Sequence, residues 1–535
     1  MPKGQGGTIA AAPLQITRAR VCSAAARARE VLYGAGRPIS PSDTKIARSA
    51  ARPPPLPPGR RPMLSATTRM RSDVTAWAPS RTLGVRRVAL LALVALATGA
   101  GCARAPAPRH LLIVTVDTLR ADRLGAYGNR LGLTPNLDRL AAGALRFSTA
   151  YAAAPFTLAS VAALMTGRYP EELGVLSNPV AVPETFPTLA TRLRRHGWRT
   201  AAVVSNFILR ETCGLGEGFD RYDASFPEVE AHRPVPERTA AQTTEAALRA
   251  LEFLRTSRMS STFLWVHYQD PHGPYTPPPG LRERFLEAER AAPDGRTLLP
   301  ALDDERGIGG IPHYQFEEGQ HEAAWYRAGY DGEVRHVDEQ IGRLLAAYAA
   351  RVPAEEAIVV FAADHGEGLG EGDYWFAHGE RLTDALVRVP LLLRAPRRLP
   401  GSRADVVSLI DLVPTLLHAL GVRDADPLAG RDLLAPEPER GPGTAYFATL
   451  QESTRPRFGL AWGGRKYVVS MEEDGPREEL FTLDDEQPSG PGPLAAMRRE
   501  LGALRARLPA GAVHAQVLSA RDQERLRALG YVSGP

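Results

Sequence analysis

Residues 111–128 read LLIVTVDTLRADRLGAYG, and this stretch decides the class of fold. Its first six residues form a continuous run that contains Ile and Val and is apolar apart from Thr115, and the run stops at Asp117. A short apolar run of this kind is typical of a strand buried on both faces of a parallel sheet. We therefore expect a buried strand that ends in a carboxylate.

Four later runs have the same character, and helical patterns separate them. The strand-like runs lie at residues 200–205, 262–267, 357–362 and 389–394, and the helical patterns at 134–143, 160–166, 188–196, 239–256, 330–349 and 410–420. This alternation predicts an α/β fold with a doubly wound, mostly parallel sheet and helices on both faces. In such sheets, ligands bind beyond the carboxyl ends of the strands.

Polar side chains stand at the ends of four of these expected strands. In chain order they are Asp117, then Asn206, then the segment from His267 to His272, then Asp364 with His365. Carboxylate and imidazole groups are common metal ligands, and their gathering at one edge is hard to reconcile with a purely structural role. We expect the functional site at this edge.

The sequence pattern changes after residue 440, from alternating strands and helices to short strands followed by charged helices. Residues 458–470 and 479–483 have the pattern of short strands separated by Gly-Gly and Asp-Gly turns, and residues 494–508 and 520–529 have that of charged helices. The pattern predicts a catalytic domain over residues 110–440 and a small antiparallel subdomain over residues 441–535.

Charge is distributed unevenly along the chain. Residues 1–109 contain 18 Lys or Arg and three Asp or Glu, while the whole chain carries a net charge of +5, so the remainder carries a net charge of −10. An acidic folded part argues against a nucleic-acid partner.

The N-terminal part is predicted to lie outside the fold. Residues 1–87 are expected to be a disordered extension, or an extension upstream of a start at Met70, that ends in the basic part of a signal sequence. Residues 88–102 form an apolar run that ends in small residues and Cys102, which resembles a bacterial lipoprotein processing site, although Gly99 stands where Leu is preferred. We expect export to the cell envelope with a possible membrane tether through lipidated Cys102. A plain cleaved signal and an uncleaved anchor stay open.

Several motifs resemble the sulfatase family of the alkaline-phosphatase superfamily, in the same order along the chain. They are residues 112–122 (LIVTVDTLRAD), 125–128 (GAYG), 134–138 (TPNLD), 164–170 (LMTGRYP), 330–333 (YDGE), 363–367 (ADHGE), 388–391 (RVPL), 411–416 (DLVPTL) and 479–483 (ELFTL). The resemblance implies an alkaline-phosphatase-like fold and hydrolysis or transfer of a sulfate or phosphate ester. It also implies that Asp117, Asp364 and His365 are metal ligands.

The position of the family's nucleophile departs from the sulfatase pattern. Sulfatases carry Cys or Ser, any residue, Pro, any residue and Arg, and the first residue becomes a formylglycine; the aligned residues here, 157–161, are TLASV. Thr157 then takes the nucleophile and metal-ligand position as an unmodified hydroxyl. In this it resembles the phosphotransferase branches, which include lipoteichoic-acid synthases and phosphoethanolamine transferases. The alternative is that Thr157 only caps a helix that starts near Ser160.

Further expectations follow from the resemblance. His272 and His378 fall in segments that contact the ester, so both are candidate catalytic and substrate-binding residues, and Asn206 is a candidate substrate-binding residue. His365 stands where arylsulfatases carry Asn, which shifts the expected divalent ion from Ca towards Mn or Zn. A second ion held by Asp270, His272 and His378 is a further alternative.

Three functions remain open at this stage. The first is a metal-dependent hydrolase or transferase that uses Thr157 on a phosphate mono- or diester of a small molecule, a glycan or a lipid headgroup. The second is a true sulfatase with a non-standard nucleophile. The third is a catalytically inactive homologue that binds a glycan or a headgroup.

Overall fold

The computed structural model describes residues 107–528, apart from 179, 227, 230–235, 256–260, 437–442, 451–454, 484–485, 491 and 515–518. The predicted extension at 1–87, the signal segment at 88–102 and the lipid attachment at Cys102 lie outside the described residues. Within the described part of the chain, no helix combines the length and the apolar character needed to cross a bilayer.

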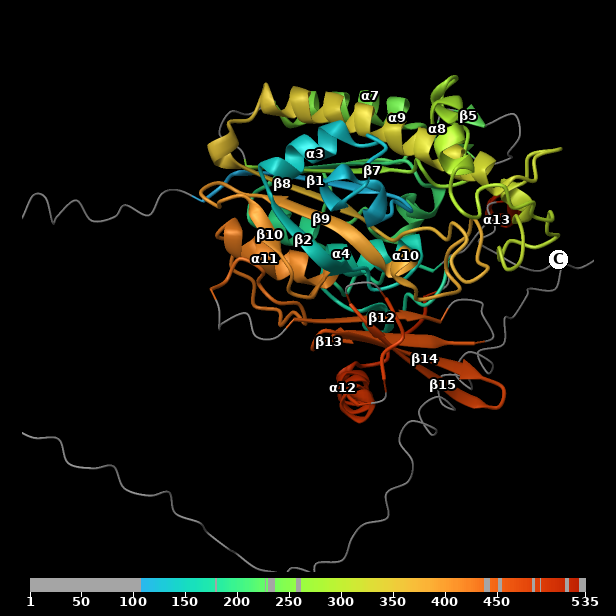
Figure 1. Ribbon diagram of the computed structural model, residues 1–535. Helices are drawn as coiled ribbons and strands as arrows, with labels where there is room; N and C mark the ends of the chain where they lie inside the picture. The colour runs from blue at the N-terminus through green and yellow to red at the C-terminus, as the bar shows by residue number, and fades with distance from the viewer. Residues whose placement is uncertain are drawn as a thin grey trace, which may run out of the picture. The chain divides into compact units, whose positions relative to one another are not determined.

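A nine-stranded sheet forms the centre of the fold (Figure 1). Its strands run in the order β10-β2-β9-β8-β1-β7-β3-β4, with β11 also paired to β2. Pairing is parallel except at β9, which is antiparallel to both β2 and β8. The bounds are β1 (His110–Val116), β2 (Leu145–Tyr151), β3 (Arg199–Val204), β4 (Arg221–Asp223), β7 (Thr262–Tyr268), β8 (Ala357–Ala363), β9 (Arg388–Arg394), β10 (Gly401–Arg403) and β11 (Val407–Ser408).

The doubly wound, mostly parallel α/β sheet that the sequence predicts is confirmed, and all five predicted strands lie within one residue of observed strands. The strand β2 was not predicted. It reads LRFSTAY, and it has a register shift between Phe147 and Ala150, so it offers no continuous apolar run.

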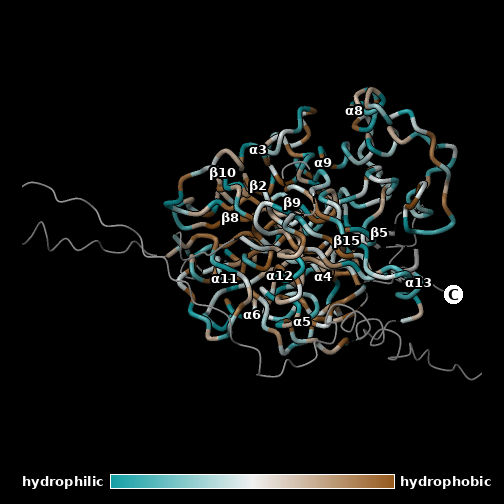
Figure 2. Tube along the Cα trace, turned by 60° about the horizontal axis from the view of Figure 1, so that its bottom comes forward, coloured by the Kyte–Doolittle hydropathy of each residue, from teal (hydrophilic) through white to brown (hydrophobic). Residues whose placement is uncertain are grey.

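Helices cover both faces of the sheet, and each of the six predicted helical patterns overlaps an observed helix. On one face lie α3 (Pro135–Ala142), α7 (Ala240–Leu254), α8 (Leu281–Arg290) and α9 (Ala323–Ala349), and on the other α4 (Thr157–Thr166) and α11 (Leu412–Ala419) (Figure 1). The helix α6 (Leu189–Arg195) packs beside α4, and α5 (Pro170–Leu173) and α10 (Asp384–Val387) are single turns. Hydrophobic residues gather along the central strands, and hydrophilic residues lie towards the periphery (Figure 2).

The register of the three central strands aligns their carboxyl ends. β1 lies between β7 and β8, and its last residue, Val116, is opposite Tyr268 of β7 and Ala363 of β8. The residues that follow these strands therefore emerge at one level. This places Asp117 next to Asp364, and the N–H of the next residue, Thr118, donates to the Asp364 carboxylate although 246 positions separate the two.

A separate four-stranded antiparallel sheet follows, as predicted. It contains β12 (Thr444–Thr449), β13 (Arg457–Trp462), β14 (Arg465–Glu472) and β15 (Gly475–Thr482), followed by α12 (Leu494–Arg507) and α13 (Ala520–Ala528). Gly463 and Gly464 join β13 to β14 with φ of 57° and 76°, the left-handed geometry that a two-residue hairpin needs. The predicted domain boundary between residues 440 and 441 falls outside the described residues.

Two polar contacts hold this sheet against the loops of the larger sheet. Lys466 of β14 is fully buried and pairs with Asp384 at 2.8 Å and with Glu486. Thr449 of β12 donates its hydroxyl to the carbonyl of Gly379. The second sheet is thereby fixed beside the loop that carries His378.

Candidate active site

The first candidate ligand, Asp117, follows β1 and is fully buried. Its backbone N–H donates to the carbonyl of Tyr268 at 2.9 Å, which continues the strand pairing by one residue. Its Oδ2 accepts a hydrogen bond from the Asn206 amide at 2.5 Å and lies 3.5 Å from His267 Nε2. Groups at the carboxyl ends of β7 and β3 thus fix the orientation of this carboxylate.

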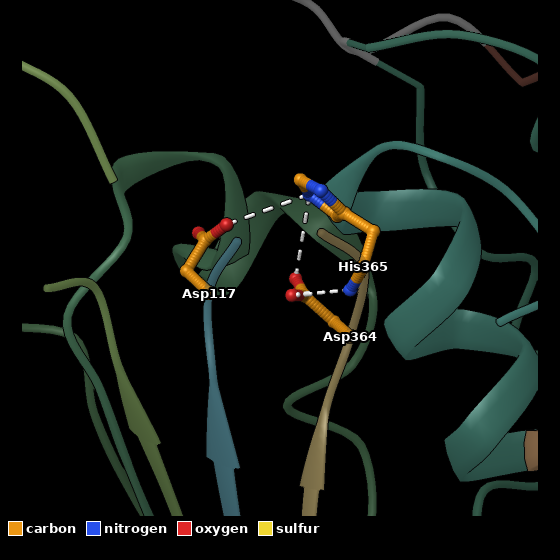
Figure 3. A group of neighbouring side chains, drawn as sticks. All are labelled: Asp117, Asp364 and His365. Carbon is orange, nitrogen blue, oxygen red and sulfur yellow. Dashed lines mark hydrogen bonds and ion pairs between the residues drawn. The ribbon is translucent and has the colours of Figure 1, made fainter. Parts of the chain in front are cut away.

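The second and third candidate ligands, Asp364 and His365, follow β8. Asp364 Oδ1 accepts the backbone N–H groups of Thr118 at 3.3 Å and of His365 at 2.8 Å. His365 Nδ1 faces the carbonyl of Gly366 at 2.9 Å. Since a carbonyl only accepts, Nδ1 carries the proton and Nε2 of the neutral ring carries the lone pair. That Nε2 lies 3.4 Å from Asp117 Oδ1 and 3.8 Å from Asp364 Oδ2 (Figure 3).

These three side chains fit a divalent cation. Asp117 Oδ1 and Asp364 Oδ2 are buried and find no hydrogen-bond partner in the described part of the chain, although a buried carboxylate oxygen normally has one. Among the described residues, this trio is the one group of three or more such side chains whose ligand atoms all lie within 4.8 Å of one another. A cation held by the three would satisfy both carboxylates and the imidazole lone pair.

Without a cation, the burial of these carboxylates opposes their ionisation, as the pKa shifts of the site show. Burial, followed by the charge of Asp117, raises the pKa of Asp364 well above its usual range. Burial, followed by His378, lowers the pKa of His365 to about 3, so this ring is neutral and able to act as a ligand at neutral pH. Burial also opposes ionisation of Asp117, but the His267 hydrogen bond and the neighbouring imidazoles outweigh it and hold its pKa below the usual range.

Thr157 is the first residue of α4 and is fully buried. Its Oγ1 lies 3.4 Å from His365 Nε2, at the edge of the ligand trio. Ser160, one turn later, donates its hydroxyl to the carbonyl of Asp364 at 2.5 Å and so ties α4 to the end of β8. The expectation that the helix starts near Ser160 is wrong by three residues, and the capping alternative is wrong with it, because the N-cap residue is Phe156.

The amino end of α4 adds anion-binding capacity to the site. The side chain of the N-cap residue Phe156 does not cap this end of the helix, and the Ser160 N–H donates to the Phe156 carbonyl at 3.2 Å. Backbone N–H groups at such an end favour an anion. Thr157 therefore lies where an anionic ester would find hydrogen-bond donors.

The two predicted histidines lie beside the ligand trio. The ring of His378 is 4.6 Å from that of His365 and 5.1 Å from that of His272, between ring centroids. His272 Nδ1 faces the carbonyl of Gly273 at 2.8 Å, and burial lowers the pKa of this ring. His378 Nδ1 faces Glu367 Oε1 at 3.3 Å, and this carboxylate, outweighing burial, raises the pKa of His378. One imidazole is thus biased towards the neutral form and the other towards the cation.

Sequence reasoning missed the role of Glu367, which is fully buried and orients His378. The signal was its place two residues after His365, inside the motif ADHGE. His267, at the start of the polar segment expected at this edge, reaches Asp117 through its ring. Trp265 Nε1 donates to Thr115 Oγ1 at 2.9 Å, and that hydroxyl lies 2.8 Å from His267 Nδ1. A short chain of hydrogen-bonding groups from β1 and β7 therefore orients the ring that contacts Asp117.

Two further predictions concern a second metal ion and the role of Asn206. Asp270, His272 and His378 do not form a compact ligand group among the described residues, and the Asp270 carboxylate instead accepts the Ala240 N–H at the start of α7, at 2.6 Å. The proposed second ion is therefore not supported. Asn206 contacts Asp117 directly, and its role towards substrate stays a prediction.

A family model named Sulfatase matches residues 109–422, and the chain belongs to this family, within the alkaline-phosphatase superfamily. An uncharacterised sulfatase, YidJ, of Escherichia coli is 26% identical over 375 residues, which cover 62% of this chain and 72% of that protein. The choline-sulfatase of Rhizobium meliloti is 24% identical over 415 residues, which cover 70% of this chain and 80% of that protein.

Solved structures share the fold. A phosphonate monoester hydrolase of Agrobacterium radiobacter superposes with a TM-score of 0.58 at 21% identity and covers 75% of this chain and 96% of its own. A 2-O GAG sulfatase superposes with a TM-score of 0.58 at 22% identity, covering 80% of this chain and 98% of that one. The protein is accordingly an ester hydrolase whose family is metal-dependent.

Proposed function

We propose that the protein hydrolyses a phosphate mono- or diester, or transfers its phosphoryl group, with the Thr157 hydroxyl as nucleophile. The observation that carries the proposal is the position of Thr157 Oγ1 at the amino end of α4, 3.4 Å from His365 Nε2. A threonine has no route to the formylglycine of the sulfatases. A direct oxygen nucleophile is familiar in phosphoryl transfer, so the residue itself favours phosphorus over sulfur.

Asp117, Asp364 and His365 would hold one divalent cation, with Mn, Zn and Ca as candidates, and Thr157 lies beside them. When bound, the cation supplies the positive charge that favours the ionised form of a hydroxyl and offsets the charge of the ester. The two buried carboxylate oxygens without partners are the observation that supports this assignment.

The chain's own groups account for the remaining chemistry. The Thr157 oxygen forms a bond to phosphorus as the bond from phosphorus to the leaving oxygen breaks, and the hydroxyl proton passes to water. The N–H groups at the start of α4 hold the phosphoryl oxygens. His378, oriented by Glu367, donates a proton from Nε2 to the leaving oxygen. Water then attacks phosphorus, the bond to Thr157 breaks, and protons return to Thr157 and His378.

His272 is assigned a binding role. Its pKa is lowered and its Nδ1 proton is directed to the Gly273 carbonyl, so its Nε2 accepts a hydrogen bond from the substrate rather than donating a proton. Asn206 holds Asp117 in place, and donation from its amide to an ester oxygen remains part of the proposal.

A true sulfatase is the second candidate, and the names of the relatives support it, since they include a choline-sulfatase and an N-acetylglucosamine-6-O-sulfatase. The discriminating experiment is an activity screen of the full chain on a matched aryl sulfate, aryl phosphate and aryl phosphodiester, with Mn, Zn, Ca or Mg added after chelation. We expect ion-dependent turnover of a phosphate ester. Turnover of the sulfate alone would overturn the phosphate assignment. No turnover of any ester, together with binding of a glycan or headgroup, would support the inactive homologue.

Location is a separate proposal. We infer export to the cell envelope from the apolar run at residues 88–101 and the small residues before Cys102. Metabolic labelling with a fatty-acid analogue tests the lipid tether, and a Cys102→Ser variant that still carries the label would contradict it.

A further inference from the structure

The loop of residues 300–316 lies against residues 373–376, which lead to His378. The Trp375 N–H donates to the carbonyl of Gly307 at 2.7 Å, and a Cβ on Gly307 would clash with the Trp375 carbonyl. The two segments are therefore in close contact three residues before one of the two candidate catalytic histidines.

Phe376, two residues before His378, has an unusual backbone conformation. Its φ is 51°, in the left-handed region that a bulky side chain rarely adopts. Its N–H donates to the carbonyl of Gly368 at 2.6 Å, and its ring is fully buried. A conformation of this kind persists only where the surrounding contacts hold it. The contacts made by Phe376 therefore control the course of the chain towards His378.

Two neighbouring side chains of the loop hold the carbonyl of Phe376. Tyr314 donates its hydroxyl to this carbonyl at 2.9 Å, and Gln315 donates its side-chain amide to it at 3.3 Å. The Tyr314 N–H in turn donates to Glu305 Oε2 at 3.0 Å, so Tyr314 is itself held within the loop. Because the carbonyl belongs to the peptide between Phe376 and Ala377, these bonds fix the peptide that directly precedes the residue before His378.

The same two side chains also lie against the segment that carries His272. The ring of Tyr314 is 6.4 Å from that of His272 between centroids. A Cβ on Gly273 would clash with the side-chain amide of Gln315, and the Gly273 carbonyl is the group that His272 Nδ1 faces. One short part of the loop thus contacts both segments that bear the candidate histidines.

We propose that Tyr314 is a positioning residue for His378. Its hydroxyl holds the Phe376 peptide in the left-handed conformation, and this sets the backbone from which the His378 ring extends, while Glu367 orients the ring itself through Nδ1. The inference rests on the proposed function, in which His378 Nε2 passes its proton to the leaving oxygen as the bond from phosphorus to that oxygen breaks.

The basicity of the leaving oxygen provides the test. A weakly basic oxygen, as in a nitrophenyl ester, leaves without a proton, whereas the more basic oxygen of a phenyl ester needs a placed donor. Tyr314→Phe keeps the ring and removes only the hydroxyl. With the full chain and its activating ion, kcat for the phenyl ester should fall about tenfold or more. The kcat for the nitrophenyl ester and both KM values should stay within about twofold of the wild type.

The matched control is Tyr326→Phe. The Tyr326 hydroxyl accepts the Glu317 N–H at 3.0 Å and donates to the Gln320 carbonyl at 3.0 Å, so it ties the backbone just beyond the loop without bonding the Phe376 carbonyl. This variant should leave both esters unchanged. Equal losses of kcat on the two esters, no loss on either, or the same selective loss in Tyr326→Phe would each overturn the inference and leave the proposed function intact.

If the wild-type chain turns over neither ester, the proposed function fails, and the hold of Tyr314 on this segment is tested by hydrogen exchange. The N–H groups of Trp375 and Phe376 donate to the carbonyls of Gly307 and Gly368. Their exchange, followed by mass spectrometry, should be faster in Tyr314→Phe than in the wild type and in Tyr326→Phe. Equal exchange in the three proteins would reject a positioning role for Tyr314.

Discussion

The substitution Asp364→Asn should have opposite effects on stability with and without metal. Asp364 Oδ1 accepts two backbone N–H groups, and Oδ2 has no partner. An asparagine in the same orientation keeps the accepting oxygen, places its NH₂ at Oδ2, and removes one negative charge. In the metal-free protein, this relieves repulsion with Asp117.

The size of the effect follows from the spacing of the carboxylates. The ligand oxygens of Asp117 and Asp364 lie within 4.8 Å of each other. Two unit charges at that distance repel by about 3 kcal/mol at an effective dielectric constant of about 20. This value is an upper limit, because the raised pKa of Asp364 favours the protonated acid, which carries no charge. For a chain of this length, 3 kcal/mol corresponds to roughly 3 °C in melting temperature. The metal-free variant should therefore melt up to about 3 °C higher than the metal-free wild type.

With metal bound, the wild type should melt at a higher temperature than the variant. A cation at one hundred times its dissociation constant stabilises the wild type by about 2.7 kcal/mol, and the variant loses most of this because it has lost an anionic ligand. Scanning calorimetry in chelator and in saturating Mn, Zn or Ca provides the four melting temperatures. Asp338→Asn is the matched control, since Asp338 is also buried but caps α3 through the N–H groups of Asn136 and Leu137. Asp338→Asn should change the melting temperature by the same amount in chelator and in metal.

A result that refutes this reasoning is a fall in melting temperature for Asp364→Asn of equal size in chelator and in metal. Such a result would make Asp364 a hydrogen-bonding group of the strand end and not a ligand.

Three further predictions follow from other parts of the structure. His267→Ala should weaken metal binding about 10- to 100-fold by freeing Asp117 to rotate, and metal titration by calorimetry measures this; unchanged affinity would argue against the contact. Burial raises the pKa of Asp331 to about 7, so its contribution to stability is complete below its ordinary value of about 4 and is lost as the pH rises through 7. Urea unfolding measured between pH 5 and 8 should show the free energy of unfolding falling as the pH rises, by on the order of a few kcal/mol in total. In Asp331→Asn this pH dependence should be weaker. Lys466→Met should destabilise the protein by about 3 kcal/mol, because it leaves Asp384 without its buried cation, and adding Asp384→Asn should recover part of the loss.

The sheet was predictable because its strands are buried on both faces. β8 is apolar throughout, and β1 and β7 are mostly apolar. Polar residues stand at or after the strand ends, so both the order of elements and the edge that carries the site could be inferred from the sequence. The strand β2 escaped prediction because Arg146 and Ser148 interrupt its apolar side chains.

The strand ends placed Asp117, Asp364 and His365 at one edge, and the resemblance to the sulfatase family marked them as candidate metal ligands, but the groups that orient them could not be predicted. Glu367 reaches His378, which lies eleven positions later in the chain, and His267 faces Asp117 because β7 pairs with β1 in one particular register. Neither relation leaves a periodic signal in the chain.

The most direct test of the central claim is the turnover rate of Thr157→Ala beside Thr157→Ser, measured on the ester that the wild-type chain hydrolyses and with its activating ion. Serine keeps the hydroxyl at the start of α4, so Thr157→Ser should retain measurable turnover, whereas Thr157→Ala should lose at least about a thousandfold in kcat. If Thr157→Ala hydrolyses the ester at the rate of the wild type, Thr157 is not the nucleophile and another group performs the attack.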